Sequence, residues 1–466
     1  MTSAAPTFDL VIIGAGAAGE SAAYEACALG LRVAIVDRRW YGGSCPHIAC
    51  VPSKALLHAA AEHRVDPDGY PWTRASERRD WMVNRAPDAV EPDDSGHRKR
   101  LEDAGATVHP GSARIVGRGR VEVAHDGAVH VLEAREVVVA VGSFSTVPDL
   151  PGLDEAAPWT NEQATLTREL PRSLVVLGGG PSGCELAQVY ARFGVPVSLV
   201  HSRPLLAAQM HPRNADVLRT ALERAGVTVR TGVRATGVRA RMGADGAHVL
   251  DLADGSSVEG HAILLAVGRT IPLRDLGLEH YGIDGTAKDP YQRDGRMRIA
   301  EGLLAAGDAA GPEMHTHLAH YQGELVARLV AGHDAEPDYR ALPRAMYTDP
   351  ELAFVGVTVE EAREAGLDAF ELTADFATST RGYGVEADLG HVTIVVDRGS
   401  RQLAGAAMAC PDASAAIHEC VLAIKARVPI DVLADTIHAF PSTSRILNGL
   451  FADALKELAK PSGAQG

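Results

Sequence analysis

Cysteine is scarce in this chain, with six among 466 residues. So few cysteines in so long a chain exclude a small secreted domain held together by several disulfides. No apolar run is long enough to span a membrane, and we expect no signal peptide in the short, polar N-terminus. We therefore expect a cytoplasmic protein, in which a disulfide serves catalysis more often than structure.

Blocks of basic residues are also missing. The formal charge is −15 at pH 7, and lysine and arginine are not clustered. This charge argues against nucleic acid or an anionic membrane as a partner and leaves a small-molecule substrate. Hydrophobic residues make up 46% of the chain, which is ordinary for large globular cores, and the length suggests roughly three domains.

Two of the cysteines stand five residues apart, in the glycine- and proline-containing segment 42–54. On a regular helix the Cα atoms of Cys45 and Cys50 would lie about 8.7 Å apart, whereas a disulfide requires less than about 7 Å. If the two residues pair, the backbone between them is not a regular helix. Pro46 and Pro52 each disfavour helical backbone at the preceding residue. The segment alone is compatible with a redox pair or with two unrelated buried cysteines.

A dinucleotide-binding fingerprint opens the chain. We expect a strand over residues 8–13, a Gly-x-Gly-x-x-Gly turn, a helix to about Leu29, a strand over 32–36 and then an acid, Asp37. The glycines permit a tight turn, the approach of a pyrophosphate and close packing of helix on strand, and the acid suits the ribose hydroxyls. These glycines are Gly14, Gly16 and Gly19.

The same pattern recurs in the middle of the chain. A strand expected over 173–177 precedes the glycine turn, which leads to a helix ending near Phe193 and a strand over 197–200. Its glycines are Gly178, Gly180 and Gly183. Two complete fingerprints predict two bound dinucleotides, because a dehydrogenase with a single cofactor needs only one.

The residue after the second of these strands bears on the choice of nucleotide. NAD-specific sites usually carry an acid there, which holds the ribose 2′-hydroxyl. This chain has His201, with Arg203 two residues later. Without a carboxylate nothing repels a 2′-phosphate, and Arg203 is suited to bind it by charge-assisted hydrogen bonds. The pattern predicts NADPH over NADH, the alternative being a solvated arginine at a strand end.

These motifs together resemble the pyridine nucleotide-disulfide oxidoreductases (class I), from about residue 7 to about residue 455. The most specific feature is Cys-x4-Cys followed by Pro-Ser-Lys. The family includes dihydrolipoamide dehydrogenase, glutathione reductase, mercuric reductase and carboxylating 2-oxopropyl-coenzyme M reductase. The variant Gly-Gly-Ser-Cys-Pro-His is most similar to the carboxylating enzyme and then to mercuric reductase-like members, whereas Ser53 and Lys54 follow the ordinary family pattern.

The resemblance implies an α/β protein with two Rossmann-like dinucleotide-binding domains and a C-terminal α+β dimerisation domain, assembled as a homodimer. Strands and two helices are expected in that last domain. The implied domains are FAD-binding (first part) at 1–152, NAD(P)H-binding at 153–272, FAD-binding or central (second part) at 273–343 and the interface at 344–466.

The resemblance also implies a relay in which NADPH reduces FAD and FAD reduces a Cys45–Cys50 disulfide. In the family the first cysteine exchanges with the substrate and the second makes charge-transfer contact with the flavin, which assigns those roles to Cys45 and Cys50. A thiolate beside the flavin needs a lowered pKa. Lys54 and Glu185 match the family's ion pair beside the flavin ring.

Further residues match family segments that contact the cofactors. The apolar run 303–308 resembles the second flavin motif, in which Asp308 bonds the ribityl chain, and His320 matches a segment near the flavin ring. The spacing of His315, His317 and His320 suggests metal ligands, but no acid or cysteine completes the set, so no metal is expected. The other implied cofactor residues are Gly43, Ser44, Gly142, Gly268, Arg269 and Gly307.

The C-terminal segment departs from the family pattern. Disulfide-reducing members carry His directly before Pro and Glu five residues after that His, whereas this chain has Phe440 and Arg445. The acid–base pair is therefore absent, with His438 as the one nearby substitute. The carboxylating enzyme also has Phe at this place. Mercury reduction is disfavoured because no cysteine pair follows Cys420.

The sequence thus predicts an FAD-dependent, NADPH-using oxidoreductase with a redox-active disulfide that acts on a small-molecule disulfide, thioether or related acceptor. One alternative is an enzyme similar to the carboxylating reductase. Others are mercuric reductase-like or dihydrolipoamide dehydrogenase-like enzymes. A different class of protein, a redox-sensing flavoprotein, is also compatible with these motifs.

Overall fold

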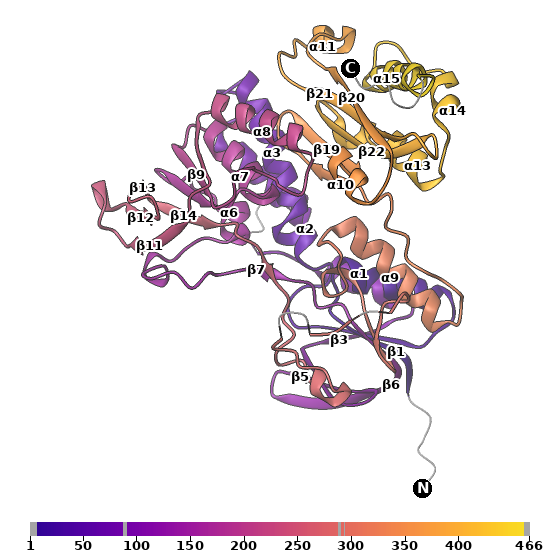
Figure 1. Ribbon diagram of the computed structural model, residues 1–466. Coiled ribbons are helices and arrows are strands. Elements are labelled where there is room, and N and C mark those ends of the chain that lie inside the picture. Colours follow the sequence, from indigo (N-terminus) through magenta and orange to yellow (C-terminus); the bar gives the residue numbers. More distant parts are fainter. Residues whose placement is uncertain (1–6, 87–90, 288–289, 293, 461–466) are drawn as a thin grey trace. The chain divides into compact units, whose positions relative to one another are not determined.

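The structure is a computed structural model, and it divides into two compact units (Figure 1). The residues it describes are 7–86, 91–287, 290–292 and 294–460. Unit 1 consists of Met1–Ala55, Ser76–Thr146 and Gly268–Pro337. Unit 2 consists of Leu56–Ala75, Val147–Val267 and Asp338–Gly466. The expectation about a signal peptide falls on residues 1–6, which lie outside the described part.

Unit 1 is built on a sheet whose strand order is β16-β17-β6-β1-β2-β3, with β5 paired to β6 and β4 to β5. The strand β1 pairs in parallel with β2 on one side and β6 on the other. Its residues alternate between two buried cores, Leu10 and Ile12 in one and Val11 and Ile13 in the other. Burial on both faces explains the unbroken apolar run. The strands are β1 Phe8–Ile13, β2 Val33–Asp37, β3 Thr107–Pro110, β4 Ser112–Gly117, β5 Arg120–His125, β6 Ala128–Val139, β16 Arg298–Ala300 and β17 Leu303–Ala305.

Helices α1 (Ala17–Ala28) and α9 (Thr316–Val330) pack side by side against one face of this sheet (Figure 1). Their approach is close: a Cβ on Gly323 would lie 2.2 Å from the carbonyl oxygen of Ala18. The remaining elements of unit 1 are α2 Ser44–Ile48, α5 Ser95–Asp103 and the strand pair β7 Phe144–Ser145 and β15 Arg269–Thr270. Helices α3 Cys50–Val65 and α4 Trp72–Asn84 each run from one unit into the other.

In unit 2 the second fingerprint lies on a parallel sheet with the order β10-β9-β8-β14. An antiparallel sheet, β11-β12-β13, belongs to the same unit. The strands are β8 Leu174–Leu177, β9 Val197–His201, β10 Val227–Thr231, β11 Ala235–Arg239, β12 His248–Leu252, β13 Ser257–Gly260 and β14 Ala262–Leu265. The helices are α6 Asn161–Leu166, α7 Pro181–Arg192 and α8 Pro212–Arg224.

The rest of unit 2 is an antiparallel sheet, β18-β19-β22-β21-β20, which we call the interface sheet. Helix α15 packs on its core through Leu447, Leu450, Phe451 and Ala454, whose spacing places them on one face of the helix. The strands are β18 Arg344–Met346, β19 Glu351–Gly356, β20 Ala369–Asp375, β21 His391–Asp397 and β22 Gln402–Cys410. The helices are α10 Val359–Glu364, α11 Thr380–Gly384, α12 Ala413–Ala416, α13 His418–Lys425, α14 Ile430–Asp435 and α15 Thr443–Leu458.

The expected α/β class and the two Rossmann-like sheets agree with the structure. The expectation of two helices after the first interface strands is wrong, because six helices are described there and four of them have six residues or fewer. The expected nucleotide-binding and interface domains fall within one compact unit, and the predicted domain borders stay predictions. Among the described residues, no helix is long and apolar enough to cross a membrane.

Candidate active site

The first fingerprint forms a tight turn between β1 and α1. Gly14 has a φ of +101°, and a Cβ there would lie 2.3 Å from the carbonyl oxygen of Ala140. A Cβ on Gly19 would lie 1.9 Å from the carbonyl oxygen of Gly14. Only glycine fits at either position. Gly16 is the N-cap of α1, so the helix N-terminus at this turn is bare of side chains and suits a phosphate group.

The carboxylate of Asp37 lies beside this turn. Its Oδ2 accepts the N–H of Ala15 at 2.7 Å, and its Oδ1 accepts the N–H of Arg39 at 2.8 Å. Burial raises the pKa of Asp37, and the backbone hydrogen bonds oppose that rise. The predicted ribose ligand is therefore held next to the predicted pyrophosphate turn.

Gly43 brings the cysteine segment against the same turn. A Cβ on Gly43 would lie 2.6 Å from the Cα of Gly16, and the φ of Gly43 is +70°. Gly43 is the N-cap of α2, and Ser44 is its first residue. The turn, Asp37 and Gly43 form a surface of bare backbone and one acid, and this surface fits a dinucleotide such as FAD.

The backbone between the two cysteines departs from helix, as a disulfide would require. The departure is at Ala49, which has φ −128° and ψ −97° and separates α2 from α3. Its predicted place is wrong, because Cys45 and Val51, the residues before the two prolines, are both helical. Each proline lies in the first turn of its helix, where its missing N–H removes no helical hydrogen bond.

The two cysteines interact with each other and with α9. The pKa of Cys45 is raised, first by its hydrogen bond with the Cys50 side chain and then by burial, while Thr316 and Lys54 lower it. The sulfur of Cys50 lies 3.4 Å from the hydroxyl oxygen of Thr316, the first residue of α9. Because a helix N-terminus is electropositive, this place favours a thiolate.

Asp308 follows β17 and is held by two residues far from it in sequence. The hydroxyl of Ser143 donates to Asp308 Oδ2, and Arg269 Nε donates to that hydroxyl oxygen at 2.6 Å. Arg269 Nη2 also donates to the carbonyl oxygen of Ser143 at 2.6 Å. The neighbouring backbone N–H of Gly307 donates to Gln322 of α9 at 2.8 Å. Asp308, Arg269 and Gly307 therefore lie together, and Gly142 and Gly268 lie next to this cluster in the chain.

Two of the three predicted histidines stack on each other, and His320 has a contact of its own. His315 Nε2 lies 2.8 Å from a carboxylate oxygen of Glu313, an acid that the sequence analysis did not count. The rings of His315 and His317 stack with centroids 5.1 Å apart, and His320 Nδ1 lies 2.7 Å from the hydroxyl of Ser21. Among the described residues, no group of three or more His, Cys, Asp or Glu side chains is arranged to hold a metal ion.

The second fingerprint repeats the geometry of the first. Gly178 has a φ of +120°, and a Cβ there would lie 2.1 Å from the carbonyl oxygen of Ala266. A Cβ on Gly183 would lie 2.1 Å from the carbonyl oxygen of Gly178. Gly180 is the N-cap of α7, as Gly16 is of α1. The same backbone constraints therefore support a second dinucleotide site.

His201 stands where NAD-specific sites carry an acid. Its Nδ1 accepts the backbone N–H of Gly179 at 3.1 Å, so a neutral ring carries its proton on Nε2. Burial lowers the pKa of His201, and the charge of Arg203 lowers it further. Arg203 is exposed. The His201 ring also hydrogen-bonds the backbone of Leu205, so this end of β9 offers the Arg203 guanidinium, and no carboxylate follows the strand.

Lys54 and Glu185 belong to different units of the structure, so their ion pair stays a prediction. Within unit 2, Glu185 is buried in α7 and accepts the backbone N–H of Tyr347 at 2.9 Å. Within unit 1, Lys54 lies on the first turns of α3, where its charge lowers the pKa of Cys45.

At the C-terminus, Phe440 is exposed over 69% of its surface and stands three residues before the start of α15. Arg445 lies in the first turn of that helix, where its guanidinium donates to the side-chain oxygen of Asn448. Asn448 in turn donates to the carbonyl oxygen of Ala434 at 3.0 Å. Neither Phe440 nor Arg445 offers a group that titrates near neutral pH.

His438 has a buried side chain, whereas a proton shuttle would be accessible to solvent. Its side chain is 4% exposed, and its Nε2 lies 2.6 Å from a carboxylate oxygen of Glu419. Its Nδ1 donates to the carbonyl oxygen of Thr436 at 2.8 Å. Both ring nitrogens are thus engaged inside the interface domain, and a catalytic role for His438 stays a prediction.

Comparison with known proteins identifies the family. The sequence model described as pyridine nucleotide-disulphide oxidoreductase matches residues 8–323, and the model of that family's dimerisation domain matches residues 342–449. The chain belongs to the pyridine nucleotide-disulphide oxidoreductase family.

Curated relatives match along nearly the whole chain. A dihydrolipoyl dehydrogenase of Thermus scotoductus is 34% identical over 455 residues, which cover 94% of this chain and 95% of the relative. One of Halobacterium salinarum is 32% identical over 451 residues, covering 94% of each chain.

Solved structures of family members also superpose on the chain. A copper(II) complex of RclA, an HOCl-induced flavoprotein disulfide reductase from Escherichia coli, has a TM-score of 0.85 at 26% identity and covers 96% of this chain and 99% of its own. LpdA from Mycobacterium tuberculosis has a TM-score of 0.83 at 26% identity, with 97% and 99% covered.

Family membership confirms the coarse prediction. The protein is a flavoprotein disulfide oxidoreductase, an enzyme of the class that uses FAD and a pyridine nucleotide. The two fingerprints supply the dinucleotide sites that this class requires.

Two residues of this family member were missed by the sequence analysis. Thr316 contacts Cys50, and Ser143 joins Asp308 to Arg269. Both are small hydroxyl residues without a motif of their own. Their positions gave a weak signal, since Thr316 lies among the singled-out histidines and Ser143 directly follows the predicted Gly142.

Proposed function

We propose that this enzyme uses NADPH and passes electrons through a Cys45–Cys50 disulfide to a small-molecule disulfide or a related sulfur acceptor. The observation that carries the proposal is the cysteine pair on either side of the break at Ala49, in which the Cys50 sulfur contacts Thr316 at the N-terminus of α9. Held by the first glycine turn and Asp37, FAD would supply the redox chemistry that carries an electron pair from the nicotinamide to this disulfide.

The two cysteines divide the work. After reduction, the Cys45 thiolate attacks one sulfur of the substrate disulfide, a mixed disulfide forms and the first substrate thiolate leaves. The Cys50 thiolate then attacks Cys45, which releases the second substrate thiol and restores the Cys45–Cys50 disulfide. Thr316 supports the thiolate at Cys50 in this sequence, since its hydroxyl lies against that sulfur.

The preference for NADPH rests on Arg203. Replacing Arg203 with Ala is expected to raise the apparent KM for NADPH about tenfold and the KM for NADH less than about twofold, because only the 2′-phosphate pairs with the guanidinium. The backbone carbonyl of Arg203 accepts the N–H of Gly232 at 2.9 Å, and this bond survives the change. Arg234→Ala, an exposed arginine of the same domain, is the control. Equal use of both nucleotides by the wild type would contradict the assignment.

Two observations favour different acceptors. The relatives named dihydrolipoyl dehydrogenase favour a lipoamide-type cyclic disulfide, which this enzyme would reduce to the dithiol. This chain has Phe440 and Arg445 in place of an acid–base pair, which favours a reaction without a proton donor at the substrate sulfur. The carboxylating reductase, which the sequence resembles, also has Phe at this place. The proposal keeps the sulfur acceptor common to both.

An acceptor panel tests the proposal. Purified protein with FAD is expected to oxidise NADPH continuously with one sulfur acceptor among lipoamide, glutathione disulfide, small aliphatic disulfides and a 2-oxoalkyl thioether with bicarbonate. The same preparation is expected to be a homodimer by light scattering, which the match to a dimerisation domain supports. A single reduction of the protein with no turnover on any acceptor would favour the redox sensor instead.

A further inference from the structure

The loop after His201, residues 202–210, carries Arg203 and is called here the nucleotide loop. Its tip is exposed, whereas Leu206, Ala207 and Met210 at its base are buried. The N–H of Ala207 donates at 2.8 Å to the carbonyl oxygen of Gly179, within the second fingerprint. One part of the loop is thus tied to the dinucleotide turn itself.

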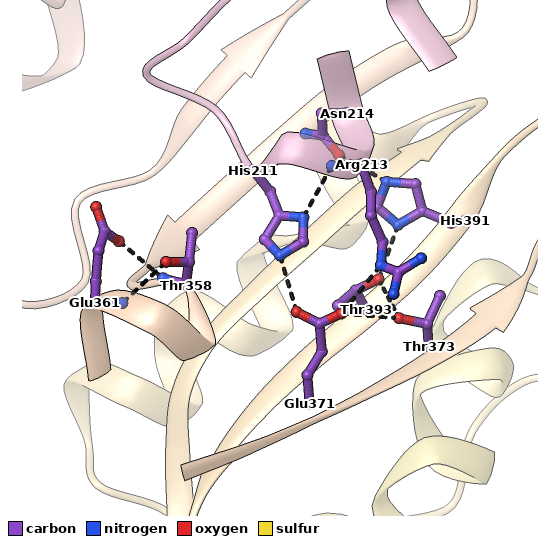
Figure 2. A network of polar contacts seen from close by, with 9 residues as sticks. All are labelled: His211, Arg213, Asn214, Thr358, Glu361, Glu371, Thr373, His391 and Thr393. Carbon is purple, nitrogen blue, oxygen red and sulfur yellow. Dashed lines mark hydrogen bonds and ion pairs between the residues drawn. The ribbon is translucent and has the colours of Figure 1, made fainter. Parts of the chain in front are cut away.

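The far end of the nucleotide loop is tied by His211, which is buried (Figure 2). His211 is the N-cap of α8, and its Nδ1 accepts the N–H of Arg213 at 3.3 Å. The proton of the neutral ring is therefore on Nε2, which donates to a carboxylate oxygen of Glu371 at 3.1 Å. A single side chain both caps the helix and links the loop to β20.

Glu371 holds two residues at once. Its second oxygen accepts from Nε of Arg213 at 3.0 Å, so the carboxylate bridges the end of the loop and the first turn of α8 (Figure 2). The Glu371 side chain is 16% exposed. Its pKa is lowered to about 2, first by the hydrogen bond from His211 and then by that from Arg213, so it is charged at neutral pH.

A separate set of contacts holds the helix body. Asn214 is fully buried, donates to the carbonyl oxygen of Ala353 on β19 at 3.1 Å and accepts from His391 on β21 at 2.9 Å. The other ring nitrogen of His391 lies 2.9 Å from the hydroxyl of Thr393. These contacts anchor α8 on the interface sheet without Glu371. Glu371 therefore adds something else, a fixed end for the nucleotide loop.

We propose that Glu371 is a positioning residue for the nicotinamide nucleotide, because through His211 and Arg213 it fixes the loop that presents Arg203. The inference rests on the proposed nucleotide site at the second fingerprint. It makes nucleotide affinity depend on the interface sheet, which contributes no residue to that fingerprint.

Two variants separate the loop link from helix stability. Glu371→Gln removes the charge that bridges His211 and Arg213. His211→Asn removes the donor to Glu371 but keeps a side chain that caps helices well, so α8 retains its N-cap. Glu364→Gln is the control, because it also removes one negative charge from the interface domain, at an exposed position at the end of α10.

Binding of NADPH to the purified FAD-loaded protein is measured directly by calorimetry, beside kcat, FAD content and melting temperature. We expect the Kd for NADPH to rise about threefold to tenfold in Glu371→Gln and in His211→Asn. The kcat and FAD content of both variants should equal those of the wild type, and Glu364→Gln should bind NADPH with the wild-type Kd. An unchanged Kd in both variants would overturn this inference and leave the proposed function standing. A parallel loss of affinity, kcat and FAD content would make the role merely structural and overturn it as well. Failure of the wild type to bind NADPH would instead overturn the proposed function on which it rests.

Discussion

The double variant Phe440→His with Arg445→Glu is expected to reduce lipoamide or glutathione disulfide about a hundredfold faster than the wild type. Thiol–disulfide exchange at neutral pH needs a group that takes and returns the proton of the departing thiol, and such help is commonly worth about a hundredfold to ten-thousandfold. Phenylalanine does not titrate, and arginine stays charged. The measurement is steady-state NADPH oxidation with each disulfide.

The double variant is expected to fold, for reasons local to α15. Ser442 is the N-cap of this helix and accepts the N–H of Arg445 at 3.1 Å, which places residue 445 at the third helical position. A glutamate there completes a capping box and favours the helix dipole. The variant loses the hydrogen bond from Arg445 to Asn448, but Asn448 keeps its own hydrogen bond to Ala434. Because Phe440 is exposed in the described chain, a histidine there leaves no cavity.

Single variants serve as controls for this prediction. Arg445→Glu alone is expected to leave turnover low, because no titratable group is added at position 440. The prediction fails if the wild type already reduces lipoamide rapidly and His438→Ala abolishes that activity. The burial of His438 against Glu419 argues against that result.

Replacing Cys45 with Ser is expected to lower turnover with any disulfide by about a thousandfold or more, because the variant has no nucleophile for the substrate. Reduction of the flavin by NADPH should persist, since Cys45 is not in the second fingerprint. Stopped-flow absorbance separates the two steps. Cys27→Ser, a half-buried cysteine of α1, is the control and should retain full turnover. Full turnover in Cys45→Ser would contradict the assigned role.

The sequence predicted the two dinucleotide turns well because their constraints are local. Gly14 and Gly178 need left-handed backbone, and the third glycine of each turn packs against the first. The sequence predicted the break between the cysteines but not its place. Proline disfavours helical backbone at the preceding residue, but the first turn of a helix tolerates it, so Pro46 and Pro52 lie inside helices and the break falls at Ala49.

Long-range contacts were beyond prediction from one sequence. His211 and Glu371 are 160 positions apart, and neither lies in a motif. Thr316 reaches Cys50 across 266 positions. The interface domain was also misjudged, because helices such as α12 and α14 are too short to show helical periodicity.

The most direct test of the electron path is an anaerobic titration of the FAD-loaded protein with NADPH, followed by absorbance. The account predicts that partial reduction of the wild type produces a long-wavelength band, because it assigns the Cys50 thiolate, next to the N-terminus of α9, to charge-transfer contact with bound oxidised flavin. The band should be absent in Cys50→Ser and present in Cys27→Ser. A wild type that binds no FAD, or that is reduced without this band, would contradict the account.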